Sequence, residues 1–213
     1  MKITFHYVRH GETLFNVLDR MQGWCDSPLT QHGIQQALEA RQQLLPIPLN
    51  RAFSSTSERC IDTANIILSG RTVPLVTTKG LKEVSFGRWE GEKSTNIQQE
   101  LLLHRQTQDY SDVGGESKEE IRRRIRHTFE QILAASNDQE HVLIVSHGAY
   151  FLQMCEVLFH ISKDDLIRRI SLPQDYKGNP IVNGYVADFV YEDGSYWLTW
   201  MNGIKDISAI TKQ

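Results

Sequence analysis

Two tripeptides with a central histidine, RHG at 9–11 and SHG at 146–148, stand out as residues that could do chemistry. Each follows a run of apolar and β-branched residues, at 3–8 and 142–145, that predicts a strand. Ligand sites in open α/β sheets form beyond the carboxyl ends of strands, so both imidazoles are expected at such a site. The glycine after each histidine is expected to allow a sharp turn and a close approach of the backbone to a ligand.

Two arginines would complete a site for an anion. Arg59 falls in the first turn of a predicted helix after the strand 51–54. An arginine there opposes the helix dipole, which indicates a functional reason for its position. With Arg9 it offers planar donors suited to phosphoryl oxygens, and helix N-terminal amides would add to them. Together with His10 and His147, this set predicts a site for a phosphate monoester.

A leaving alcohol needs a proton, and Glu83 is the candidate to supply it. Its apolar neighbours in the sequence would favour the protonated carboxyl that a general acid requires. Glu90 and Glu92 are expected to be exposed and outside the mechanism. A metal site is the other common use of paired histidines. It is disfavoured here because the adjacent arginines would repel a cation and no carboxylate or thiolate stands at ligand spacing.

Strands alternate with helices along the chain, and these elements must position the candidate residues. Thr30 and Ser117 are expected to begin helices as N-caps. The alternation predicts a three-layer α/β/α sandwich with a mostly parallel sheet, to which a closing hairpin adds an antiparallel edge. Strands are expected at 3–8, 51–54, 73–77, 142–145, 185–191 and 196–200. A helix is expected in each of the three segments that join the first four strands, and another directly after the strand 142–145.

The segment 92–116 is polar and irregular, and we expect it to be a small insertion or lid within a single domain of residues 1–213. The basic run at 122–126 is expected to be the solvated face of a helix, with Glu119 and Glu120 near enough to pair with it. Cys60 and Cys155 are expected in the core and Cys25 in an exposed loop.

The composition excludes several classes of protein. The chain has 213 residues, 40% of them hydrophobic and 23% charged, which is typical of a globular protein. The net charge of −3 argues against a nucleic-acid partner. The first apolar stretch is too short and polar for a signal peptide or a membrane span. The three cysteines cannot form a fully paired framework, so reduced thiols and a cytoplasmic location are expected.

These motifs occur in the order found in a known family. The chain closely resembles the histidine phosphatase superfamily, in its phosphoglycerate-mutase-like branch, from residue 3 to about residue 150. The motifs that carry the resemblance are RHGET at 9–13, DSPLT at 26–30, SS at 54–55 with Arg59 and TA at 63–64, LKE at 81–83, Gly87 with WEG at 89–91, GES at 115–117 and VSHG at 145–148.

The resemblance implies a role for each matching residue. His10 would be the nucleophile that forms a phosphohistidine, and Glu83 would protonate the leaving oxygen and then activate water. Arg9, Arg59 and His147 would hold the phosphoryl group and stabilise its transition state. Asn16, Gln22 and Gly23 match positions in or near the phosphate site.

The family contains phosphatases, which pass the phosphoryl group to water, and cofactor-dependent mutases, which return it to the substrate. The resemblance implies that mutases of this family are longer chains with a larger insertion after the acid. We therefore favour a phosphatase that acts on a small phosphorylated metabolite, with no cofactor or metal. A cofactor-dependent phosphoglycerate mutase is the alternative, and a non-catalytic phospho-ligand binding protein is a third option. The oligomeric state stays open, with a homodimer as one option. Candidate specificity residues are Leu101, Leu102, His104, Arg105, Tyr110, Trp24 and the segment 168–176.

Overall fold

The fold is built on one six-stranded sheet with the strand order β3-β2-β4-β1-β5-β6. The computed structural model describes residues 1–170 and 179–204. The strands are β1 (Lys2–Arg9), β2 (Arg51–Ser55), β3 (Leu75–Thr78), β4 (His141–Ser146), β5 (Val186–Glu192) and β6 (Ser195–Met201). The helices are α1 (Leu14–Val17), α2 (Gln31–Leu44), α3 (Glu58–Leu68), α4 (Gln98–Thr107), α5 (Lys118–Ala134), α6 (Gly148–Phe159) and α7 (Lys163–Arg169).

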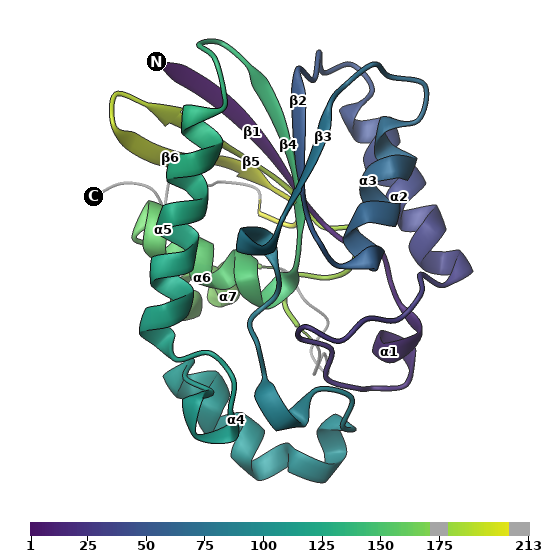
Figure 1. Cartoon of the computed structure of the whole chain (residues 1–213), viewed down its shortest axis with the longest axis vertical. Coiled ribbons are helices and arrows are strands. Elements are labelled where there is room, and N and C mark those ends of the chain that lie inside the picture. The colour runs from purple at the N-terminus through teal and green to yellow at the C-terminus, as the bar shows by residue number, and fades with distance from the viewer. Residues whose placement is uncertain (171–178, 205–213) are drawn as a thin grey trace.

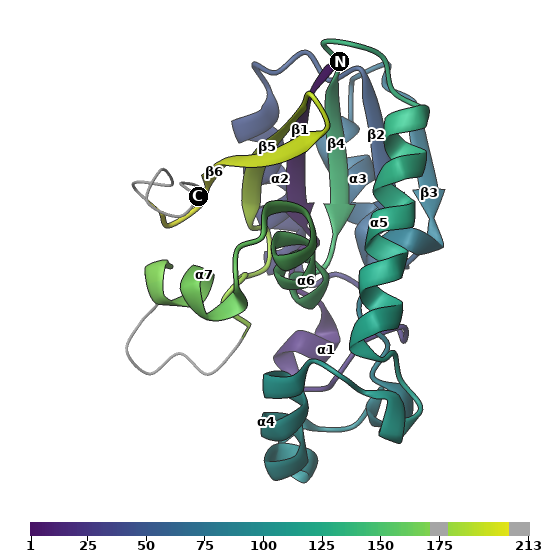
Figure 2. The ribbon, with the colours of Figure 1, turned by 90° about the vertical axis from the view of Figure 1, so that its left-hand side faces the viewer.

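The sheet is parallel from β3 to β1 and antiparallel at its other end. β1 pairs with β4 in parallel and with β5 in antiparallel, and β6 pairs with β5. The predicted parallel sheet with an antiparallel edge is therefore confirmed. In the β1–β4 register Arg9 lies opposite Ser146, so the two histidines that follow leave neighbouring strands at the same edge. Figure 2 shows that β1 and β4 both run toward the end of the molecule that holds α1 and α4.

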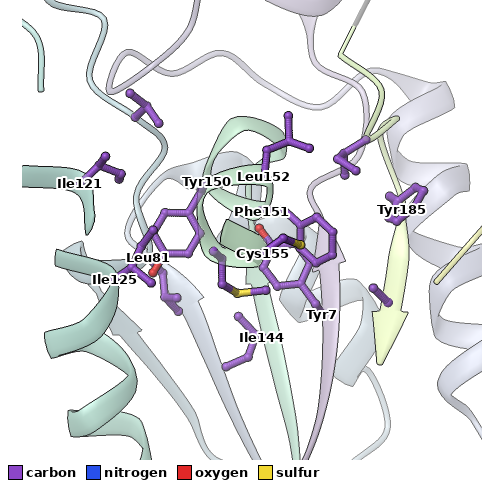
Figure 3. Close-up of a cluster of buried hydrophobic side chains, with 14 of the residues drawn as sticks. Tyr7, Leu81, Ile121, Ile125, Ile144, Tyr150, Phe151, Leu152, Cys155 and Tyr185 are labelled. Atoms are coloured by element: carbon purple, nitrogen blue, oxygen red, sulfur yellow. The ribbon is translucent and has the colours of Figure 1, made fainter. Parts of the chain in front are cut away.

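Helices cover both faces of the sheet, with α2 and α3 on one side and α5 and α6 on the other (Figures 1 and 2). β4 is buried along almost its whole length because it is covered on both sides, which explains its continuous apolar run. Figure 3 shows the core on the α6 side, where Phe151 and Cys155 of this helix lie against Tyr7 and Ile144 of the central strands. A second core between the sheet and α2 and α3 contains Val8, Ala64 and Ile67.

Both predicted N-caps are present. The Thr30 hydroxyl accepts the Gly33 amide at the start of α2. Ser117 forms a reciprocal capping box with Glu120 at the start of α5. These caps fix where two helices begin, directly after segments that border the site.

We had expected the segment 92–116 to be irregular, and this was wrong. It contains α4 and two 3₁₀ turns, Ser94–Ile97 and Ser111–Val113. Leu101 and His104 on α4 are buried, and the His104 ring packs against Trp89 at 4.6 Å. Leu102 and Leu103 are exposed, which obscures the helical periodicity in the sequence. The insertion therefore adds Leu101, Tyr110 and Val113 to the main core of the protein.

The basic run on α5 was also only partly predicted. Arg126 is exposed and lies 4.0 Å from Glu119, as expected of a solvated face. Arg122 instead pairs with Glu156 of α6, and Arg124 turns inward to Glu116. In residues 1–170 and 179–204, no helix is long and apolar enough to cross a membrane.

Gly11 has a role in packing that we had not predicted. A Cβ at Gly11 would lie 2.2 Å from the Gly33 carbonyl oxygen, and a Cβ at Gly33 would lie 2.0 Å from the Glu12 carbonyl oxygen. The turn after His10 therefore packs backbone to backbone against the first turn of α2. Glycine is needed at both positions for this contact within the protein, and the approach of the Gly11 backbone to a ligand stays a prediction.

We predict that Gly33→Ala destabilises the fold. The added methyl group has no room against the Glu12 backbone, and overpacking of this kind costs about 1–3 kcal/mol. Urea denaturation measures the loss in the free energy of unfolding. Gln35→Ala, at an exposed position of the same helix, is the control and should stay within about 0.5 kcal/mol of the wild type. Equal stability of the two variants would contradict the tight contact.

Candidate active site

His10 lies directly after β1 with its ring fixed by the backbone. Its backbone amide donates to the Ser146 carbonyl at 3.0 Å, which ties the two strand ends together. Nδ1 of His10 lies 2.8 Å from the Gly11 carbonyl, which can only accept, so Nδ1 carries the proton. Nε2 is then unprotonated, and its lone pair accepts from Nε of Arg59 at 3.3 Å. This is the tautomer that a nucleophilic imidazole requires.

Arg59 is the most connected side chain of the site. It projects from the first turn of α3, and only 1% of it is exposed. Besides His10, its guanidinium donates to His147 Nδ1 at 3.1 Å and to Asp26 Oδ1 at 2.8 Å. Its remaining partners are two loop carbonyls, those of Gly23 and Cys25.

His147 is buried beside His10, with 5.3 Å between the ring centroids. Because its Nδ1 accepts from Arg59, its Nε2 carries the proton and donates to the Ser55 hydroxyl at 2.8 Å. The Cys60 thiol also contacts this ring, at 3.5 Å from Nε2. The imidazole is therefore held on one side by Arg59 and on the other by the end of β2.

Both imidazoles are neutral in the folded protein. Burial, followed by the Arg59 and Arg9 guanidinium groups, holds the pKa of His10 well below its ordinary value of 6.5. Burial and then Arg59, with smaller contributions from His10 and Arg9, lower the pKa of His147 in the same way. A neutral His10 keeps its lone pair available for attack on phosphorus.

Arg9 lies at the end of β1, and its side chain donates to the Ile181 carbonyl. A Cβ at Gly148 would lie 3.2 Å from the Arg9 guanidinium carbon and 2.6 Å from the Asn179 amide nitrogen. Glycine at 148 therefore makes room for Arg9 and Asn179, again a requirement of the protein itself. The result is that Arg9 and Arg59 lie near the same pair of histidines.

The carboxylate of Glu83 is tied to the start of α6. It accepts the backbone amides of Ala149 at 3.1 Å and Tyr150 at 2.7 Å, and also the amide of Val84. These amides are among the unpaired donors of the first helical turn, so Glu83 acts as a cap for α6. The sequence had predicted an apolar setting, whereas the carboxylate accepts three backbone amides. One of these belongs to Ala149, two positions after His147, so the acid and this histidine lie close together.

Asp26 was not predicted as a site residue, and its carboxylate has two partners there. One oxygen pairs with Arg59, and the other accepts the Glu58 amide at the start of α3. The helix amides that we expected to face a bound anion are thus partly used by Asp26 at α3 and by Glu83 at α6. The DSPLT motif gave the signal for Asp26, but only the fold brings it to Arg59.

Asn183 is a second residue that the sequence did not reveal. Its side-chain amide donates to the His10 carbonyl at 3.1 Å and to Asn16 Oδ1 at 3.2 Å. Asn16 Oδ1 also accepts the Thr13 amide, so this predicted phosphate contact lies in the turn beside His10. Gln22 is buried, and its side chain accepts from the Ser27 hydroxyl at 3.4 Å.

We had predicted that Glu90 is exposed, but it is only partly exposed and has partners in the site. Its carboxylate accepts the amides of Cys25 and Phe86. Glu90 therefore joins the loop that contains Gly23 and Cys25 to the segment after Glu83. Gly23 has φ +55°, and a Cβ there would lie 2.4 Å from the Glu90 carboxylate. Glu92 is exposed, as predicted.

Trp24 borders the acid on the side of the solvent. Its indole Nε1 donates to the Glu83 carbonyl at 2.9 Å, the Lys82 ammonium lies 5.0 Å from the ring centroid, and 42% of the residue stays exposed.

The other candidate specificity residues divide into two groups. Leu101, His104 and Tyr110 are buried, so they stabilise the packing of the insertion and do not present a binding surface. Leu102 and Arg105 are exposed. Of the segment 168–176, residues 171–176 lie outside the described residues.

The described part of the chain contains no group of three or more His, Cys, Asp or Glu side chains that could hold a metal ion. The site contains a neutral imidazole whose Nε2 is unprotonated, two guanidinium groups and the buried carboxyl group of Glu83. Such a set suits transfer of a phosphoryl group to nitrogen with proton transfer to the leaving oxygen.

We predict that stability falls as the pH drops below about 6.5, the ordinary value of a histidine pKa. The unfolded chain binds protons at His10 and His147 there, whereas the folded chain does not, so acid favours unfolding. Each histidine contributes at most about 1.4 kcal/mol per pH unit. The variant His10→Asn should show a smaller slope of unfolding free energy against pH in urea denaturation from pH 7.5 to 5. A slope equal to that of the wild type would mean that folded His10 is not neutral.

We also predict that Glu83→Ala loses stability through the end of α6. Removal of the carboxylate leaves the amides of Ala149 and Tyr150 without this acceptor, and loss of a helix cap costs roughly 1 kcal/mol. Glu83→Gln keeps an acceptor oxygen and should lose less. Thermal denaturation of both variants measures the difference. If both lose the same amount, the carboxylate is not a cap.

Comparisons with known proteins agree with this chemistry. The family model of the histidine phosphatase superfamily (branch 1) matches residues 5–175. The 2,3-bisphosphoglycerate-dependent phosphoglycerate mutase of Cytophaga hutchinsonii is 32% identical over 167 residues, 75% of this chain and 78% of that protein. The adenosylcobalamin/alpha-ribazole phosphatase of Salmonella typhimurium is 34% identical over 150 residues, 66% of this chain and 71% of that protein.

The fold comparison gives the same family. The crystal structure of phosphoglycerate mutase from Bacillus anthracis superposes with a TM-score of 0.78 and 29% identity, over 98% of this chain and 95% of that one. The sequence-based resemblance is thereby confirmed: the chain belongs to the histidine phosphatase superfamily.

Proposed function

We propose that the protein is a phosphomonoester hydrolase that acts through a phosphohistidine on His10. The observation that carries the proposal is the state of this imidazole: Nδ1 donates to the Gly11 carbonyl, and the lone pair of Nε2 lies against Arg59. A phosphoryl group that accepted from the Arg59 guanidinium in place of Nε2 would lie beside this nitrogen and be positioned for in-line attack. The substrates would be small phosphate esters, and the protein would work in the cytoplasm without a cofactor.

The proposed reaction has two steps. Nε2 of His10 forms a bond to phosphorus while the bond to the leaving oxygen breaks, and Glu83 gives that oxygen its proton. Water then attacks the phosphohistidine, its proton passes to Glu83, and inorganic phosphate leaves with His10 regenerated. Arg9, Arg59 and His147 would stabilise the charge on the transferring oxygens in both steps.

The relatives leave two outcomes for the phosphoryl group, because one is named a mutase and another a phosphatase. We favour transfer to water since the insertion after Glu83 is short and contains a single helix, α4. A cofactor-dependent phosphoglycerate mutase remains the second candidate, supported by the printed name of the mutase relative. A non-catalytic binding protein would need no nucleophile, and it is disfavoured by the unprotonated Nε2 of His10.

We predict that His10→Ala abolishes hydrolysis of p-nitrophenyl phosphate and of a panel of phosphorylated metabolites. The variant lacks the attacking nitrogen, so kcat should fall by about 1000-fold or more. The control His127→Ala removes an exposed histidine on α5 and should keep wild-type activity. With ³²P-labelled substrate and an alkaline quench, the wild type should carry label and His10→Ala should not.

Two results would contradict the proposal. Undiminished activity of His10→Ala would exclude the phosphohistidine. Turnover of 3-phosphoglycerate that depends on added 2,3-bisphosphoglycerate, with no release of inorganic phosphate, would assign the protein to the mutases.

A further inference from the structure

Arg124 of α5 is bound to the loop that carries Glu83. Its guanidinium donates to the carbonyls of Gly80 at 2.9 Å, Lys82 at 2.8 Å and Glu83 at 3.1 Å. Only 16% of the side chain is exposed. One side chain therefore fixes the backbone on the N-terminal side of the acid, up to the acid itself.

Glu116 extends the same network to the C-terminal side of the acid. It forms a two-pronged pair with Arg124, both contacts at 2.7 Å, and the same carboxylate accepts the Ser85 amide at 2.9 Å. The Glu116 amide in turn donates to the Ser85 carbonyl at 3.0 Å. Arginine suits this position because its planar fork reaches several acceptors at once, which the single ammonium of lysine cannot do.

The carboxylate of Glu83 is held by a separate element. The start of α6 donates two amides to it, from Ala149 and Tyr150. The Arg124 guanidinium also lies 5.4 Å from the centroid of the Tyr150 ring, so it contacts both supports of the acid. A shift of the loop would move the Glu83 backbone while the helix keeps hold of its carboxylate.

The neighbouring arginines of α5 show that this arrangement is not a general property of the helix. Arg122 pairs with Glu156 of α6, and Arg126 lies at the surface near Glu119. Among these three, only Arg124 contacts the loop of the acid. We propose that Arg124 and Glu116 are positioning residues for Glu83 and that they act on the transfer of its proton to the leaving group, an inference that rests on the proposed function.

This role predicts a dependence on the leaving group. An alkoxide is a poor leaving group and needs the proton from Glu83, whereas p-nitrophenolate departs without one. Displacement of the acid should therefore slow the hydrolysis of alkyl phosphates far more than that of p-nitrophenyl phosphate. The ratio of kcat/KM for the two substrates isolates this effect, because kcat/KM covers the steps up to alcohol release and excludes the later attack of water.

The test uses Arg124→Lys and Glu116→Gln, with Arg126→Ala as the matched control on the same helix. For glycerol 2-phosphate we expect kcat/KM to fall by about 10- to 100-fold in the first two variants, since small misplacement of a catalytic group has effects of this size. For p-nitrophenyl phosphate the loss should be about threefold or less, given that no proton is required. The control should match the wild type on both substrates, and thermal denaturation shows that each variant is folded.

A second comparison separates positioning from general support of the fold. In a Glu83→Gln background, Arg124→Lys should change kcat/KM for glycerol 2-phosphate by less than about threefold, because the proton donor is already gone. An equal loss on both substrates, or the same loss with and without Glu83, would overturn the inference and leave the proposed function intact. No hydrolysis of either substrate by the wild type would overturn the proposed function, and this inference with it.

Discussion

The site depends on one buried guanidinium, that of Arg59. A charge with 1% exposure is stable only when its donors are matched by acceptors, and two loop carbonyls, Asp26 and both imidazoles supply them. Burial and then this charge make protonation of His10 and His147 unfavourable, so the guanidinium that orients the two imidazoles also helps to keep them neutral. A bound phosphoryl group would compete for donors that the protein has already arranged.

Carboxylates at the two helix starts divide the work around this centre. Asp26 takes an amide at the start of α3 together with Arg59, and Glu83 takes two amides at the start of α6. Each carboxylate group therefore fixes both a helix and a part of the site. The glycines after the histidines have a comparable role, because they allow backbone and side chains to pack where any Cβ would collide.

The fold and the central site residues could be predicted because each depends on local signals. The apolar strand 142–145, the caps and the residues at strand ends are readable in the sequence, and the comparisons confirm the family. The supports of the site could not be predicted. Asn183 lies 173 residues after His10 in the sequence and contacts it only because β5 pairs with β1. Arg124 faces inward only because α5 packs against the loop that carries Glu83. Helical periodicity shows that a residue lies on a face, but it does not show what covers that face.

The antiparallel edge of the sheet has a consequence for the order in which the site forms. β1 ends at Arg9, yet β5, its antiparallel partner, begins at Val186, and the His10 carbonyl accepts from Asn183 and Gly184. Contacts this distant in sequence form late in folding, since a long loop must close first. On the ribosome His10 would therefore lack these partners until the segment from Asn183 onward has emerged, so a chain cut before that segment would lack a formed site.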